Sequence, residues 1–285
     1  MALQLVEDLL ERLHQAKALD VVANPVSSFV GGVIPHGVVK DALSGTWLGH
    51  PLHPMLTDVA IGSWTSAFVI DAVGREGSEA AADTLVGIGV LSALPTAAAG
   101  LADWSDLMDA ERRVGLVHAG TNIVAVGLYG WSWLARRNGD RSLGVTLSLL
   151  GATVATVGGY LGGHLSYRQG VNVDRNAWQE GPGEWTDTVD AADLAEGRPV
   201  VASAGDVEVL LVRRGDTIHA LGDVCGHAGG PLHEGEVDGD CVTCPWHAST
   251  FRLSDGAALH GPATAPQPAY DTQVAGGRVQ VRRRA

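Results

Sequence analysis

Apolar residues form long runs in the first part of the chain and short alternating segments in the last part. Three runs contain no Asp, Glu, Lys or Arg, at residues 84–102, 114–135 and 142–167. A helix needs about 20 apolar residues to cross a hydrocarbon layer of about 30 Å, so each run can span a bilayer. A fourth run, residues 56–73, is interrupted only near its ends, by Asp58 and Asp71. The pattern predicts four transmembrane helices.

The regions that flank these runs have different patterns. Val6, Leu9, Leu10 and Leu13 fall on one helical face, which predicts an amphipathic helix lying on the membrane or on the bundle. Residues 21–55 are rich in Gly and Pro and are expected to be irregular. After residue 185 the apolar residues alternate over short segments bounded by turns, which predicts strands at 207–213, 217–221 and 278–282.

These patterns predict a two-domain fold: an α-helical membrane bundle of four transmembrane helices, followed by a small all-β domain. The expected parts are an N-terminal amphipathic helix with an irregular segment, the bundle, a linker and the β domain, at residues 1–47, 48–173, 174–184 and 185–285. At 285 residues the chain is long enough for each domain to bury a core of its own.

The charge distribution limits the partners of the chain. Of the net charge of −13, residues 171–285 contribute −8, from 17 acidic and 9 basic side chains. This excess of negative charge argues against a nucleic-acid binder, because phosphate would be repelled. An acidic surface suits docking to a basic redox partner, although most such surfaces serve solubility.

Candidate metal ligands lie close together in the predicted β domain. Cys225, Cys241 and Cys244 fall within one stretch of 20 residues, and the chain has no other cysteine. An odd number of clustered cysteines with His227 and His247 beside them favours a metal site over a disulfide framework. A structural zinc ion would also accept two Cys and two His, but zinc fingers do not normally use C-x-H followed by C-x-x-H.

The two loops resemble those of the Rieske family. The stretch C-G-H-x-G-x-x-L begins at Cys225, and C-P-W-H-x-x-x-F begins at Cys244. The resemblance implies a small antiparallel β fold that holds a [2Fe–2S] cluster. It also implies the ligands: Cys225 and Cys244 on one iron, and His227 and His247 on the other. Cys241 lies outside both loops and is expected to be a free thiol.

At some positions the sequence departs from the Rieske pattern, and each departure predicts a difference in the site. Ala248 stands where a Gly is usual, so the packing of the second loop is expected to differ slightly. Ser249 occupies the place of a hydroxyl that bonds to a cluster sulfur, but Phe251 replaces the tyrosine of that pair. Fewer hydrogen bonds to the sulfurs lower the potential, so we expect a midpoint in the lower half of a range of about −150 to +300 mV.

Polar side chains concentrate at one end of the predicted bundle. Residues 48–173 resemble an uncharacterised bacterial family of four-helix membrane domains, through a His53-Pro54 opening and His118 among other positions. One hypothesis is that His118 and His164 ligate a b-type haem, with His53 as a further candidate. The alternatives are hydrogen bonds between helices, to side chains such as Asn122, and a quinone pocket built from the same groups.

The sequence therefore predicts a membrane-anchored electron-transfer protein that passes single electrons through a Rieske [2Fe–2S] cluster. Its expected partners are the lipid bilayer and a redox protein or a quinone, and no nucleic acid. The alternatives are a quinol-oxidising subunit of a redox enzyme and a redox sensor. We expect a multi-pass protein of the bacterial cell membrane with its β domain in the cytoplasm. Basic residues balance at the two ends of the bundle, and the N-terminal residues do not resemble a secretory signal.

Overall fold

The computed structural model describes residues 2–74 and 76–284. The chain folds as two compact units. One unit is helical and is built from Met1–Ile34 and Leu52–Val171. The other is mainly β-structure and is built from Pro35–Pro51 and Asn172–Ala285. Residues 35–51 therefore belong with the C-terminal unit, which differs from the expected division into separate segments at 1–47 and 185–285.

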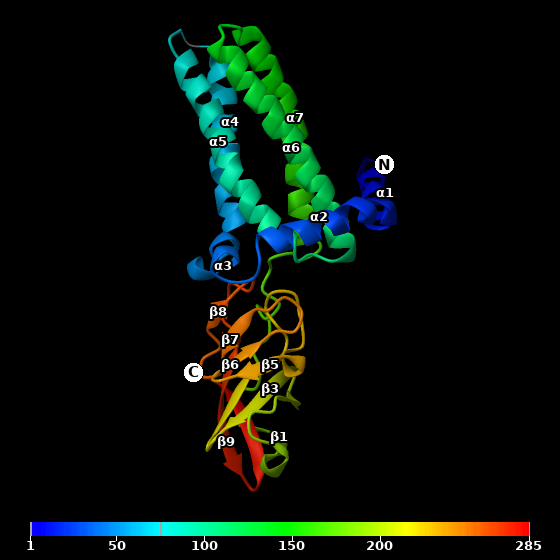
Figure 1. Cartoon of the computed structure of the whole chain (residues 1–285), viewed down its shortest axis with the longest axis vertical. Coiled ribbons are helices and arrows are strands. Elements are labelled where there is room, and N and C mark those ends of the chain that lie inside the picture. The colour runs from blue at the N-terminus through cyan, green and yellow to red at the C-terminus, as the bar shows by residue number, and fades with distance from the viewer. Residues whose placement is uncertain (1, 75, 285) are drawn as a thin grey trace. The chain divides into compact units, whose positions relative to one another are not determined.

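Four long helices form the body of the helical unit as two antiparallel hairpins, with α4 beside α5 and α6 beside α7 (Figure 1). Their bounds are Leu52–Val73 for α4, Glu79–Trp104 for α5, Asp109–Arg137 for α6 and Arg141–Tyr167 for α7. Gly74 ends α4 and Gly139 follows α6, both with φ in the left-handed region, at 63° and 86°. Asp140 caps the N-terminus of α7 by accepting a hydrogen bond from the Leu143 N–H at 3.0 Å.

The apolar side chains of these helices lie both inside and outside the unit. Inside, Trp64 stacks on Tyr129 with 4.0 Å between ring centroids. Outside, large apolar side chains such as Phe68, Leu91 and Ile123 are exposed, as expected for a surface in contact with lipid. Among the described residues, α4, α5 and α7 are long and apolar enough to span a bilayer. Helix α6 does not meet this criterion, so three of the four predicted spans are supported.

An ion-pair network centred on a buried arginine joins the two hairpins at one end. The Arg136 side chain is fully buried and donates to Asp71 and Asp83, and Arg141 contacts the same two carboxylates. The two acids come from α4 and α5, whereas the two arginines come from α6 and α7. Because each charge has partners of opposite sign, the network can exist in a largely apolar unit.

Helices also form where the sequence was expected to be irregular. Helix α1 (Ala2–His14) is the predicted amphipathic helix, and its Leu10 packs with Val114 and Leu161 of the bundle. Residues 21–55 were expected to lack regular structure, but α2 (Asp20–Val33) and α3 (Val38–Ser44) lie there. The expectation was wrong because Ala23, Ser27 and Val30 recur at helical spacing and are buried, which outweighs the Gly and Pro signals.

Two antiparallel sheets form the core of the β unit. The larger has the strand order β1-β10-β9-β4-β3-β2 and the smaller has the order β5-β6-β7-β8. The first sheet contains Thr186–Asp190, Val200–Ala204, Val207–Arg214, Thr217–Gly222, Ala269–Ala275 and Arg278–Arg283, as β1 to β4, β9 and β10. The second contains Glu236–Asp238, Cys241–Thr243, Thr250–Arg252 and Ala258–His260, as β5 to β8. The three predicted strands correspond to β3, β4 and β10.

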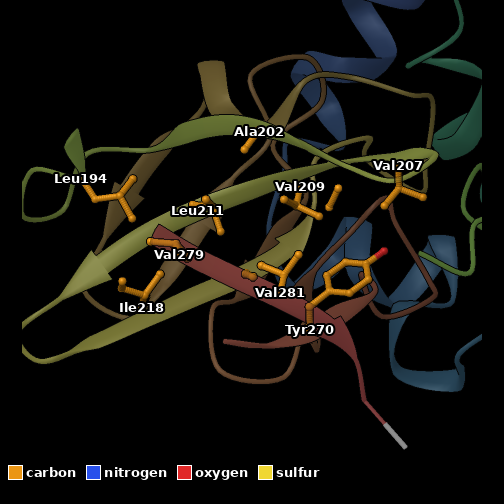
Figure 2. Packing of buried hydrophobic residues seen from close by; sticks show 11 residues of the cluster. Leu194, Ala202, Val207, Val209, Leu211, Ile218, Tyr270, Val279 and Val281 are labelled. Carbon is orange, nitrogen blue, oxygen red and sulfur yellow. The ribbon is translucent and has the colours of Figure 1, made fainter. Parts of the chain in front are cut away.

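The larger sheet is held by a cluster of alternating aliphatic residues and one tyrosine. Val209 and Leu211 of β3 point into this cluster together with Val279 and Val281 of β10, and Tyr270 lies beside them (Figure 2). These side chains are at most 2 % exposed. The other face of β3 is buried as well, because Leu210 and Val212 are at most 1 % exposed and pack in a second cluster. This strand is therefore more fully buried than the alternating pattern of the sequence predicts.

Candidate functional site

Two loops of the β unit carry the candidate metal ligands and have the same backbone structure. In the loop after β4, the Cys225 N–H donates to the Gly230 carbonyl at 2.9 Å, and the Gly229 N–H donates to the Cys225 carbonyl at 2.8 Å. In the loop between β6 and β7, Cys244 makes the same two bonds, at 2.8 and 3.1 Å, with the residues five and four positions further on. The two tips therefore present their side chains in equivalent ways.

The residue four positions after each cysteine adopts a left-handed conformation. Gly229 has φ 84° and Ala248 has φ 59°. Glycine reaches this region without strain, whereas alanine does so at a cost of about 1–2 kcal/mol. The second loop thus keeps the shape of the first although its sequence lacks the glycine.

The four candidate ligands are sorted by type. The thiols of Cys225 and Cys244 are hydrogen-bonded to each other. The rings of His227 and His247 lie 5.0 Å apart, centroid to centroid, at an interplanar angle of 89°. Within the described part of the chain, no three His, Cys, Asp or Glu side chains gather as a single ion would require. A thiol pair next to an imidazole pair suits two metal ions better than one tetrahedral zinc ion.

Backbone N–H groups point at both sulfurs. Those of His227 and Ala228 bond to the Cys225 sulfur, and those of the second and third residues after Cys244 bond to its sulfur. The hydrogen bond from Cys225 lowers the pKa of Cys244 to about 7, and the same bond, together with burial, raises the pKa of Cys225. Cys244 therefore loses its proton first, and a bound metal would take the place of both protons.

The imidazole of His227 is neutral at physiological pH. Burial lowers its pKa to about 3, and the nearby His247, Lys40, Arg175 and His36 add to that effect in this order. A neutral imidazole has a lone pair available for a metal. Lys40 and His36 belong to residues 35–51, so this segment brings positive charge close to a candidate ligand.

Residues 35–51 are attached to the loop that closes the site. The Asp41 carboxylate accepts the Gly261 N–H at 2.8 Å and the His260 ring N–H at 2.9 Å. Thr46 donates to the Ala263 carbonyl at 3.3 Å. The backbone approaches so closely here that a Cβ on Gly261 would lie 2.2 Å from the Thr46 hydroxyl oxygen. No local sequence pattern predicts this contact, because Asp41 and Gly261 are 220 residues apart.

Gln267 holds the backbone of the first loop by side-chain hydrogen bonds, and the sequence did not predict this role. Its side-chain oxygen accepts the Gly226 N–H and the Asn176 amide, each at 3.2 Å, and its amide donates to the Gly222 carbonyl at 2.8 Å. Gln267 is 2 % exposed. A polar side chain within the segment A-P-Q-P was the only sequence signal for it.

Ser249 holds the second loop to the closing loop. Its buried hydroxyl accepts the Ala263 N–H at 3.0 Å. The hydroxyl proton is not used in that bond, so it remains a donor for a cluster sulfur, as the resemblance implied.

The histidines of the helical unit form pairs other than the predicted one. His164 was expected to work with His118, but its Nε2 lies 3.0 Å from the Nε2 of His14. His118 instead faces His53, with 6.3 Å between ring centroids and an interplanar angle of 82°. A haem between His118 and His164 is therefore not supported. Sequence spacing could not reveal these pairs because they depend on the rotation of each helix about its axis.

Comparison with known proteins agrees with this division. Residues 184–271 match the model of the Rieske [2Fe-2S] domain, and residues 49–175 match that of a predicted membrane protein family, DUF2231. The chain is 32% identical over 98 residues to the anthranilate 1,2-dioxygenase ferredoxin subunit of Burkholderia cepacia, covering 34% of this chain and 91% of that protein. It is 36% identical over 89 residues to the 3-phenylpropionate/cinnamic acid dioxygenase ferredoxin subunit of Escherichia coli K12, covering 31% and 83%.

Among solved structures, the ferredoxin of carbazole 1,9a-dioxygenase from Nocardioides aromaticivorans IC177 is similar at 28% identity and a TM-score of 0.34. The match covers 35% of this chain and 98% of that one.

Proposed function

Because the chain belongs to the Rieske [2Fe–2S] family, we propose that it is a membrane-anchored carrier of single electrons whose cluster is held by Cys225, His227, Cys244 and His247. The main observation behind this proposal is that the two cysteine thiols lie together at the loop tips and the two histidine rings lie together beside each other. Bound there, a [2Fe–2S] cluster supplies one-electron redox chemistry. The residues of the loops would hold it, donate hydrogen bonds to its sulfurs and set its potential.

The anchor in this proposal is a bundle of four spans. Helices α4, α5 and α7 meet the length and hydropathy criteria for a span. Helix α6 has 29 residues and connects the end of α5 to the start of α7 through short turns. At about 1.5 Å per residue it is long enough to return the chain across the bilayer between two spanning neighbours. The match of residues 49–175 to a predicted membrane family supports the same conclusion.

The chain segments that form the β unit also support an even number of spans. Residues 35–51 precede α4 and residues 172–285 follow α7, yet both belong to one compact unit. The hydrogen bonds of Asp41 to Gly261 and His260 join the two segments directly. Two segments that fold together lie on one side of a membrane, and an odd number of spans would separate them.

We place the β unit on the cytoplasmic side in this proposal. Cys241 lies outside both loops and forms no disulfide, and free thiols persist in a reducing compartment. The physiological partner would then be a redox protein of that compartment, since the two relatives named above are ferredoxin subunits. Protease digestion of inside-out and right-side-out vesicles tests the side: cleavage after residue 171 only in inside-out vesicles is expected, and the opposite pattern contradicts it.

The cluster is tested on the full chain purified in detergent. We expect two irons and two acid-labile sulfides per chain, and a paramagnetic signal of a reduced Rieske centre. Cys225→Ser and Cys244→Ser should abolish the signal. Cys241→Ser is the matched control, because this thiol lies outside both loops, and it should leave the signal unchanged. One zinc ion per chain in place of iron, or a signal that survives Cys225→Ser, would refute the proposal.

A further inference from the structure

The two helical hairpins hold a histidine in the same way. On α4, the His53 Nδ1 lies 2.9 Å from the Thr96 carbonyl of α5. On α6, the His118 Nδ1 lies 2.8 Å from the Gly158 carbonyl of α7. A carbonyl can only accept, so Nδ1 carries the proton in both rings and the Nε2 lone pair is left for another group. Ligating histidines are typically fixed by such a bond from the other ring nitrogen.

A glycine four residues beyond each carbonyl makes room for the ring. A Cβ on Gly100 would lie 2.8 Å from the Cε1 of His53, and a Cβ on Gly162 would lie 3.0 Å from the Cε1 of His118. The first distance is shorter than real Cβ contacts, and the second is tight enough that the His118 ring would have to shift. Each imidazole therefore packs against the backbone of the next helix. In both hairpins a hydrogen bond to a carbonyl and a nearby glycine hold it there.

The distance between the two rings fits a metal between them. The centroids of His53 and His118 are 6.3 Å apart. With a ring nitrogen about 1.1 Å from each centroid, the facing nitrogens can come no closer than about 4 Å, which is too far for a hydrogen bond. Two imidazoles bound at about 2.0 Å on opposite sides of one metal place their nitrogens about 4 Å apart.

The number of donors decides which metal centre fits. A lone zinc or copper ion needs further protein ligands, and within the described residues no third His, Cys, Asp or Glu joins these two. A haem brings four nitrogen ligands of its own and needs only two axial ones. We propose that His53 and His118 are the axial ligands of a b-type haem held between the two hairpins. This site is independent of the cluster residues.

Two neighbouring observations define the limits of the site. Asn122 Nδ2 donates to the His118 carbonyl at 2.9 Å and lies almost equally far from the two ring nitrogens of His118, 3.4 Å from Nδ1 and 3.3 Å from Nε2. It is therefore a weak, off-axis neighbour of the Nε2 lone pair that a bound metal would replace. His14 and His164 are 3.0 Å apart between their Nε2 atoms, which leaves no space for a metal. The second pair is thus a hydrogen-bonded contact, and it offers a control in the same chain.

The test uses the full chain in detergent, reconstituted with iron protoporphyrin IX. Wild-type protein should bind one haem per chain with a low-spin, six-coordinate spectrum. His53→Ala and His118→Ala should each lose that spectrum and bind about tenfold or more weakly, whereas His164→Ala should retain both properties. Gly162→Ala should displace the His118 ring and reduce low-spin binding. Gly159→Ala is its control, because a Cβ there meets no atom within 4 Å.

The Rieske signal of each variant reports whether the chain has folded. Loss of haem with an intact cluster signal in both ligand variants supports the proposal. Wild-type protein with a normal cluster and no low-spin haem overturns it and leaves the cluster proposal standing. Copper, zinc or a quinone bound at this place without haem overturns it equally, as does haem that survives both ligand variants or is lost in His164→Ala.

Discussion

Replacing Asp41 by alanine should release residues 35–51 from the loop that closes the cluster site. The Asp41 side chain is 16% exposed and accepts the Gly261 N–H at 2.8 Å, and a hydrogen bond to a charged group contributes about 1.5–3 kcal/mol. The bond to His260, which is 55% exposed, adds at most about 1 kcal/mol. A loss of about 2–3 kcal/mol makes local opening about 30 to 150 times more frequent.

Hydrogen exchange of the full chain, read by mass spectrometry, measures this change. Peptides covering residues 38–48 and 258–263 should exchange faster by that factor in Asp41→Ala, while β3 keeps its protection. Asp190→Ala is the matched control, because its ion pair with Arg278 is exposed and 3.4 Å long. Unchanged exchange at residues 38–48, or an equal increase in the control, would show that the Asp41 carboxylate does not hold the segment.

Three further outcomes test the electrostatics and the backbone. Lys40→Met should lower the midpoint potential of the cluster by about 60 mV, a tenfold change in equilibrium for one electron, because a positive charge near His227 favours the reduced form; a redox titration showing no decrease contradicts this. Asp71→Asn should reduce stability in detergent by about 3–5 kcal/mol, since it strips a partner from a fully buried arginine. Glu7→Gln removes an exposed ion pair and should lower the melting temperature far less, so equal thermal shifts in the two variants would refute the distinction. Ala248→Gly should raise stability towards chemical denaturation by up to about 1 kcal/mol by relieving its positive φ, and a loss would show that the methyl group packs usefully.

Local sequence patterns predicted the cluster loops and the long helices because the deciding interactions there are local. In each loop the backbone bonds join residues four or five positions apart, so spacing alone fixes which side chains meet at the tip. The apolar runs correspond to helices for a similar reason, since helical hydrogen bonds join residues four apart. In the larger sheet, β10 shows the predicted alternation of buried and more exposed side chains, whereas β3 is buried on both faces.

The parts that the sequence did not predict depend on long-range contacts. The Asp41 contact joins positions 220 residues apart, and no periodic pattern connects them. Helix α2 was missed because Gly and Pro were taken to mean irregular chain, although Ala23, Ser27 and Val30 are spaced to bury one face. Proline inside a helix lowers local helix preference, and tertiary burial can outweigh that cost.

The pairing of His53 with His118 could have been sought as a repeat. Each histidine bonds to a carbonyl in the following helix, 43 residues later in one hairpin and 40 in the other. In both cases a glycine follows four residues after that carbonyl and receives the ring. A single hydrogen bond of this kind would serve packing as well as metal binding. Its use in both hairpins brings two imidazoles, each with Nδ1 bonded to a carbonyl, to a centroid separation of 6.3 Å. Imidazoles at membrane depth are costly compared with apolar side chains, so their presence points to a function. A cofactor that binds two imidazoles would explain why both hairpins place a histidine between them.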